Sequence, residues 1–111
     1  TTLGMLQKGM TSVTAASKTT YTAVASDQIV VDTAANIVTI TLPATPAVGD
    51  EVTIMDGSAT GGFATNNCVV ARNGSNIEGA ASDDSLTVNN QCVTLIYANA
   101  TKGWLYKSTN Q

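Results

Sequence analysis

The stretch that decides the fold runs from residue 37 to residue 56 and reads IVTITLPATPAVGDEVTIMD. In its first part apolar and polar side chains alternate, because Val38 and Ile40 are separated and followed by threonines. This period of two residues is typical of a half-buried β-strand. A similar alternation returns in EVTIMD. We therefore predict two strands, at residues 37–42 and 51–56.

The segment between these two strands is stiff. Pro43 and Pro46 fix their own φ and bias the residue before each of them toward an extended conformation. Gly49 permits a positive φ just before the second strand. We expect a hairpin-like scaffold with a rigid corner, in which no nucleophile, base or metal ligand is singled out.

Further strand signals surround this unit at intervals of about ten residues, with turn residues between them. We predict these strands at residues 19–24, 27–32, 68–72, 76–79, 86–89, 92–98 and 102–107. The strand at 92–98 is apolar on nearly both faces, so we expect it in the centre of its sheet. No fixed-period repeat indicates a solenoid. The expected fold is all-β, a small antiparallel β-sandwich or barrel with an extended N-terminal arm.

Asn73-Gly74 is the strongest hairpin signal in the chain. Both central positions of a type I′ turn need a positive φ, and this dipeptide tolerates it. We expect residues 76–79 to form the return strand of that hairpin.

The first eighteen residues differ in pattern from the rest and read TTLGMLQKGMTSVTAASK. Gly4 and Gly9 weaken any helix here by about 1 kcal/mol each relative to alanine. We predict an irregular or weakly helical arm at 1–18, followed by a β domain at 19–111. The apolar side chains of the arm need burial, and we expect a partner subunit to supply it; the alternative is that the arm packs on its own domain. The candidate contact residues in the arm are Leu3, Leu6, Met10 and Val13.

Composition points to a subunit of an assembly. Only 12% of the 111 residues are charged, about half the usual share, while 43% are hydrophobic. Such a surface carries few charges to keep neighbouring molecules apart. The alternative is a monomer whose surface is polar but uncharged, rich in threonine and asparagine.

Net charge and hydropathy exclude two classes of partner. The net charge is −3 and the five basic residues are scattered, whereas phosphate-backbone binding needs clustered lysine and arginine. We therefore expect no nucleic-acid partner. No segment approaches the roughly 20 apolar residues of a membrane span, and no basic segment precedes a long apolar run at the N-terminus. We expect no membrane partner and no secretory signal in this chain.

Catalytic and metal chemistry lacks its usual residues. The chain has no histidine, which excludes Ser-His-Asp and Cys-His arrangements and imidazole ligands. Cys68 and Cys92, the only cysteines, lie in strand-like apolar contexts, so we expect two reduced thiols; one disulfide is the alternative. We predict no catalytic residue, no cofactor and no metal, and therefore a protein that is not an enzyme.

Two adjacent acidic pairs remain, Asp50-Glu51 and Asp83-Asp84. Both pairs lie at predicted turns, where acidic residues are commonly solvated. Calcium binding is the alternative, but such a site gathers several oxygen ligands. We expect neither pair to hold a metal ion.

Trp104 and Tyr106 are two residues apart in KGWLYK and so lie on the same face of a strand. Exposed, this pair could stack against a sugar or a partner's side chain. The interpretation we favour is that it closes the edge of the core. Both residues are kept as candidate partner contacts.

Two long segments together resemble a known family. They are TYTAVASDQIVVDTAANIVTITLPATPAVGDEVTIMDG and NNCVVARNGSNIEGAASDDSLTVNNQCVTLIYANATKGW. The ordered features are a strand ending in TLP, a Pro–Gly–Asp corner, a segment with N-G-S-x-I-x-G, and a final G-W. This set is similar to a small β domain in structural proteins of tailed bacteriophages, including those that infect cyanobacteria. The resemblance covers nearly all of residues 20–104.

The resemblance implies a virion component, typically trimeric, that is assembled in the host cytoplasm. No catalytic residue belongs to the pattern. Fibres usually carry this domain inside a long chain, whereas here it follows an arm of eighteen residues. We therefore expect a capsid decoration (cement) protein that binds the phage head surface, contacts the major capsid protein or another virion protein, and stabilises the shell. A tail-fibre or appendage protein is the alternative, and a carbohydrate-binding module that uses Trp104 and Tyr106 is a second alternative.

Overall fold

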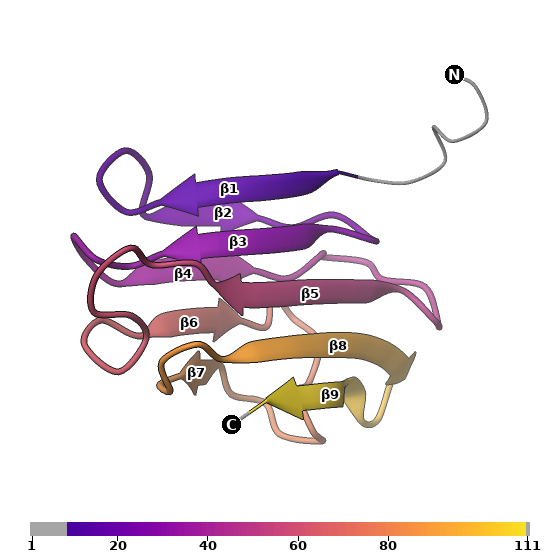
Figure 1. The fold of residues 1–111 in the computed structure, drawn as a ribbon. Coiled ribbons are helices and arrows are strands. Elements are labelled where there is room, and N and C mark those ends of the chain that lie inside the picture. The colour runs from indigo at the N-terminus through magenta and orange to yellow at the C-terminus, as the bar shows by residue number, and fades with distance from the viewer. Residues whose placement is uncertain (1–8, 111) are drawn as a thin grey trace.

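The computed structural model describes residues 9–110, with side chains up to residue 107. This part of the chain contains nine strands and no helix, arranged as two sheets (Figure 1). The five-stranded sheet has the order β1 (Met10–Thr14), β3 (Gln28–Asp32), β5 (Glu51–Asp56), β8 (Cys92–Asn99), β9 (Gly103–Asn110). The four-stranded sheet has the order β2 (Thr20–Thr22), β4 (Val38–Thr41), β6 (Cys68–Ala71), β7 (Asp84–Leu86). The all-β prediction is confirmed.

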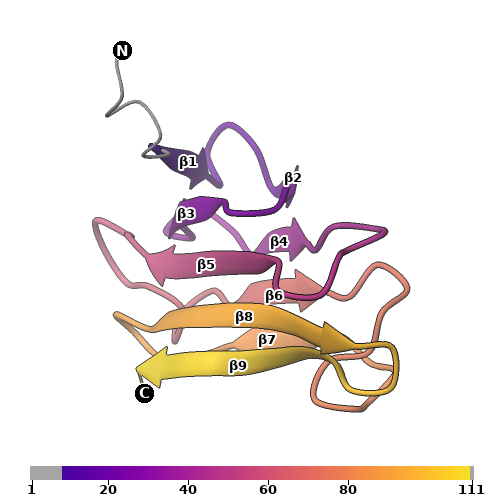
Figure 2. The ribbon, with the colours of Figure 1, turned by 90° about the vertical axis from the view of Figure 1, so that its right-hand side faces the viewer.

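From β1 to β6 the chain passes back and forth between the two sheets. Successive strands lie in opposite sheets, so that β1, β3 and β5 stack on one side and β2, β4 and β6 on the other (Figure 2). Within each sheet these neighbours are parallel: β1 with β3, β3 with β5, β2 with β4 and β4 with β6. We call this part of the molecule the winding.

The winding corrects three predictions. The sheets are mixed rather than antiparallel, and the strands of residues 10–110 form two open sheets that do not close into a barrel. The strands at 38–41 and 51–56 exist, but they belong to different sheets and form no hairpin. The chain also winds like a short solenoid although its sequence has no repeat. Alternation reveals which face of a strand is buried, but it does not reveal the strand's partner.

The corner between β4 and β5 crosses from one sheet to the other. Packed sheets lie about 10 Å apart, a distance that the residues between these strands span easily. Gly49 has a φ of +96°, as predicted, and its N–H donates to the carbonyl of Tyr97 (2.9 Å). A parallel pair needs a crossover, and here each crossover contains a strand of the opposite sheet.

The last three strands form the antiparallel end of the molecule. β7 pairs with β6, β8 with β5, and β9 with β8. β8 therefore has a neighbour on each side, which confirms its predicted central position. Asn73 and Gly74 have φ values of +51° and +93°, as a type I′ turn requires.

The predicted return strand at 76–79 is wrong. The strand that returns against β6 is β7, at residues 84–86. The backbone of 76–79 is engaged by β9 instead: the N–H of Trp104 donates to Asn76 and the N–H of Glu78 donates to Trp104, both at 2.8 Å. Ile77 forms only isolated bridges, with Ala80 and Trp104. A contact distant in sequence thus decides the path after the turn.

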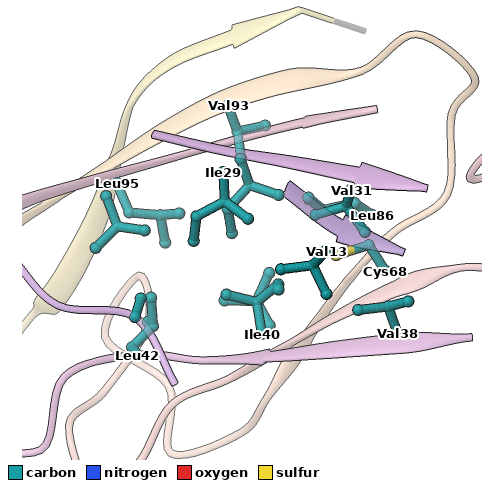
Figure 3. Packing of buried hydrophobic residues seen from close by; sticks show 14 of the residues in the cluster. Val13, Ile29, Val31, Val38, Ile40, Leu42, Cys68, Leu86, Val93 and Leu95 are labelled. Carbon is teal, nitrogen blue, oxygen red and sulfur yellow. The ribbon is translucent and has the colours of Figure 1, made fainter. Parts of the chain in front are cut away.

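The core fills the space between the two sheets. Inward side chains from both sheets meet there, as Figure 3 shows for ten labelled residues. Ile29 and Val31 of β3 face this space, as do Val38 and Ile40 of β4, and all four side chains are fully buried. Burial of an aliphatic side chain of this size stabilises a fold by about 1.5–3 kcal/mol.

From residue 10 onward, the N-terminal region is more ordered than we predicted. Residues 10–14, assigned to an irregular arm, form β1 and pair in register with β3. Val13 is only 2% exposed and belongs to the core. For these residues the alternative holds, namely that the segment packs on its own domain. The physical reason is that β3 offers an open parallel edge that a short strand without helical preference can pair with.

Candidate interaction surface

The five-stranded sheet turns one face away from the core, and we call it the outer face. Ile29 and Val31 are buried, so Val30 between them points outward. The register places Val30 beside Met55, and Met55 beside Cys92. A second apolar pair lies side by side on β8 and β9. The partly exposed apolar side chains of the outer face are Val30, Met55, Cys92, Ile96 and Leu105.

Polar groups on the outer face are mostly uncharged. The hydroxyls of Thr53 and Thr94 lie 3.0 Å apart on neighbouring strands. Charged side chains lie toward the ends: Asp32 at one end, and Glu51 with Lys107 at the other. The Lys107 Nζ–Glu51 Oε2 distance is 2.8 Å, and both side chains are more than a third exposed, so this pair contributes at most about 1 kcal/mol. A sheet face of this composition suits contact with another protein.

The predicted contact residues of the arm fall into three groups. Met10 is 61% exposed at the start of β1. Val13 is buried in the core and has almost no surface left for a partner. Leu3 and Leu6 lie outside the described residues.

Trp104 is fully buried, which confirms the interpretation that it closes the core. Its ring meets that of Tyr97 edge to face, with 5.6 Å between the centroids. The indole Nε1 is buried and has no hydrogen-bond partner among the described residues. Trp104 therefore has no exposed face on which a sugar could stack.

Tyr106 is half-buried and joins the two sheets at the antiparallel end. Its hydroxyl donates to Asp84 Oδ2 of β7, and its N–H donates to Glu78 Oε2 (2.9 Å). Burial, and then the hydrogen bond and charge of Asp84, raise the pKa of Tyr106 well above its usual value. Asp84 and Tyr106 both line a cavity of about 150 Å³ at this end. The interaction is a bridge within the domain.

Asp56, at the end of β5, connects two loops. Its carboxylate accepts backbone N–H groups from Ser58 (3.0 Å), Phe63 (3.1 Å) and Asn90 (2.9 Å). Burial alone would raise the pKa of Asp56, but these hydrogen bonds outweigh it and hold the pKa below its usual range. Sequence analysis missed this role. The signal for it was Asp-Gly-Ser after a strand, where an aspartate commonly accepts a bond from the second residue that follows.

The acidic pairs also serve local structure. Asp50 Oδ2 accepts the N–H of Ala47 (2.9 Å), and Asp83 Oδ1 accepts the N–H of Arg72 (2.8 Å). No group of three or more histidine, cysteine, aspartate or glutamate residues suited to a metal ion occurs in the part of the chain that the structure describes. The carboxylates here act as caps of turns.

Both cysteines are free thiols, and they lie in different sheets. Burial, together with the negative charge of Asp56, raises the pKa of Cys68 to about 12. A thiol that stays protonated is a poor nucleophile and behaves as a small apolar group.

A polar depression of about 270 Å³ lies at the start of β3 and β5. Asp27, the buried carboxylate in it, accepts hydrogen bonds from the Tyr21 hydroxyl (2.8 Å) and the Val24 N–H (2.9 Å). Its lining consists of Ser26, Asp27, Gln28, Gly49, Asp50, Glu51 and Thr53. This lining contains no basic or thiol group that could complete a catalytic arrangement. The outer face thus remains the strongest candidate for function.

Neither a protein-family model nor a curated protein matches this chain.

Proposed function

We propose that this protein is a structural component of a phage virion, most specifically a capsid decoration protein that binds the head surface and stabilises the shell. The observation that carries the proposal is the outer face, on which Val30, Met55 and Cys92 form an apolar row across neighbouring strands. The low content of charged residues and the resemblance of residues 20–104 to phage structural domains support it.

In this proposal the outer face packs against other copies of the chain in a homotrimer, or against the major capsid protein. Each contact is weak, and its effect is multiplied by the number of copies on the shell. The protein works by holding its shape, which suits two sheets with a continuous core. Neither a cofactor nor a catalytic residue is required.

Fibre or appendage proteins remain the alternative within the same virion class, since the same face could pack inside a tail structure. The carbohydrate-binding alternative lost its main support when Trp104 proved to be fully buried.

Cryo-electron microscopy of an intact virion tests the location. We expect copies of this domain on the head surface at the junctions between capsomers. Density for the domain at the tail, and none on the head, would contradict the decoration proposal and favour the alternative.

A substitution on the outer face tests the contact itself. Met55→Lys places a charge in the middle of the apolar row and should reduce both trimer formation in sedimentation and occupancy on capsids. Val48→Lys is the matched control, because Val48 is 74% exposed and lies in the corner before β5. Equal behaviour of the two variants would show that the outer face is not the contact.

A truncation that tests the N-terminal segment has to leave strand β1 intact. A truncation of residues 1–18 would delete β1 and disturb the fold, whereas a truncation of residues 1–8 leaves β1 intact. If the segment is a tether, the shorter truncation lowers occupancy on capsids without lowering the melting temperature. Unchanged occupancy would remove the tether from the proposal.

A further inference from the structure

Each of the two sheets has two edge strands, and these four edges differ in how they are protected. β2 and β7 have three residues each, too short to template much pairing. β9 is long, but the backbone and the Glu78 side chain of the segment 76–79 cover part of its outer edge, and its pairing with β8 is interrupted by bulges. Short length, bulges and cover are the usual ways in which proteins blunt an edge.

Within the residues that the structure describes, β1 has none of these protections. Its sequence, MTSVT, contains no charge and no proline, and its five residues pair with β3 without a register shift. Figure 1 shows β1 along one border of the ribbon, with no other described strand beyond it. An edge of this kind is a template for another strand.

The hydrogen-bond pattern between β1 and β3 identifies the backbone groups of β1 that point away from the sheet. The N–H of Ala15 donates to Asp32 of β3 (2.9 Å), so residues of the same parity, such as Val13, also turn their backbone groups toward β3. Met10, Ser12 and Thr14 therefore turn theirs away from the sheet. The carbonyl of Thr14 is already used by the N–H groups of the turn at 17–18. The groups left without a partner among residues 9–110 belong to Met10 and Ser12, with the N–H of Thr14.

We propose that β1 pairs with β1 of a second copy, antiparallel and centred on Ser12, so that two five-stranded sheets join across a two-fold axis. In this register Ser12 faces Ser12 of the other copy, and the two exchange both hydrogen bonds. Each Thr14 N–H reaches the Met10 carbonyl of the other copy. Every free backbone group of the edge except the Met10 N–H thereby gains a partner.

The side chains agree with this pairing. Met10 and Thr14, which become cross-strand neighbours, both lie on the exposed side of β1, and Met10 is 61% exposed. The pair contains no like charges to oppose contact. Combined with a trimer, such a two-fold contact would link neighbouring trimers into a net. The pairing itself needs no other virion protein and does not depend on the proposed function.

Ser12→Pro is the decisive variant. Proline at this position removes an N–H that points away from β3, so the β1–β3 ladder keeps its hydrogen bonds while the contact between copies loses its centre. Ser12→Lys is a second variant that blocks the edge with a charge and keeps the backbone unchanged. Ser85→Lys is the matched control, because Ser85 is exposed on β7 at the edge of the other sheet.

Sedimentation equilibrium from micromolar to millimolar protein measures the outcome. We expect the mass of the parent to double with concentration, the dissociation constant to rise at least about tenfold in both Ser12 variants, and no change in Ser85→Lys. In the parent, hydrogen exchange of the Ser12 amide should slow as concentration rises. A parent whose mass does not double, or Ser12 variants that associate like the parent, would overturn the proposal.

Discussion

The winding (β1–β6) and the antiparallel end (β7–β9) share one core but differ in the aromatic side chains that contribute to it. In the winding, aliphatic side chains such as Ile29, Ile40 and Val52 recur on successive stacked strands. Each of them packs in the core in a similar way. At the antiparallel end, aliphatic side chains of β7 and β8 join the same core, and aromatic residues add to them: Trp104 is buried against Tyr97, and Tyr106 bridges to the other sheet. Many similar aliphatic contacts should make the winding tolerant of a single substitution, whereas a single aromatic substitution should damage the antiparallel end more.

Trp104→Ala should give the largest effect. It removes the largest buried side chain of the antiparallel end, and we expect the free energy of unfolding to fall by about 3–5 kcal/mol, measured by urea denaturation. Ile40→Val, in the winding, should lower it by only about 0.5–1.5 kcal/mol.

Trp104→Phe separates volume from hydrogen bonding. Because no described residue bonds Nε1, phenylalanine loses packing volume but none of the described hydrogen bonds, and should be much less damaging than alanine. Equal losses in the two variants would mean that the indole N–H is bonded in solution.

Gly103→Ala should come next. Gly103 has a φ of +70°, and a Cβ there would lie 2.0 Å from the carbonyl oxygen of Asn76. Because backbone must move, we expect a loss of more than about 2 kcal/mol in the free energy of unfolding. Gly74→Ala is the control: it also has a positive φ, but no atom of the described residues lies within 4 Å of its Cβ, so the loss should be smaller. A Gly103→Ala variant as stable as Gly74→Ala would show that the backbone of the segment 76–79 moves at little energetic cost.

Asp56→Asn tests the connection between the two regions, because Asp56 is the last residue of β5 and its carboxylate accepts the N–H of Asn90 before β8. We expect a loss of about 1–3 kcal/mol at neutral pH. The pKa of Asp56 is depressed in the folded protein, so its stabilisation is present above the unfolded-state pKa and is lost as pH falls through the folded pKa. Thermal melts between pH 7 and pH 2 should therefore be flatter in the variant, and identical pH profiles would contradict this role.

Tyr106→Phe should have a smaller effect than Asp56→Asn, a loss of about 1–2 kcal/mol from the bond to Asp84. The pKa of Tyr106 is raised in the folded protein, so its stabilisation is full below the unfolded value of 10.0 and declines as pH rises above that value. The parent should lose stability in alkaline melts more steeply than Tyr106→Phe. If the stability of the parent and of Tyr106→Phe fell in parallel at alkaline pH, the pKa of Tyr106 would be the same in the folded and the unfolded protein.

Local patterns predicted the strands well where burial alternates. Residues 38–41 and 51–56 form strands, β8 is central, and Asn73-Gly74 adopts the expected turn. Partners were predicted less well, because one alternating strand suits many neighbours. The hairpin expected at 37–56 failed for this reason, and so did the return strand at 76–79.

The candidate site shows the same division. Sequence proposed Trp104 as a contact or a core residue, and only packing decided for the core. The row of Val30, Met55 and Cys92 was not visible in the sequence, since it exists only once β3, β5 and β8 align in register. Likewise the free edge of β1 follows from the pairing with β3 and not from MTSVT alone.

The sequence by itself determined an all-β chain with few charges, stiff corners and no residues for histidine chemistry, because alternation, proline, glycine and composition act locally. The tertiary structure alone decided that the strand after Pro43 and Pro46 crosses to the other sheet and pairs in parallel. The physical reason is that pairing is chosen by the joint burial of many side chains distant in sequence. The stretch at 37–56 thus supplies one crossover of the winding. Which sheet each of its two strands joins depends on the strands around it.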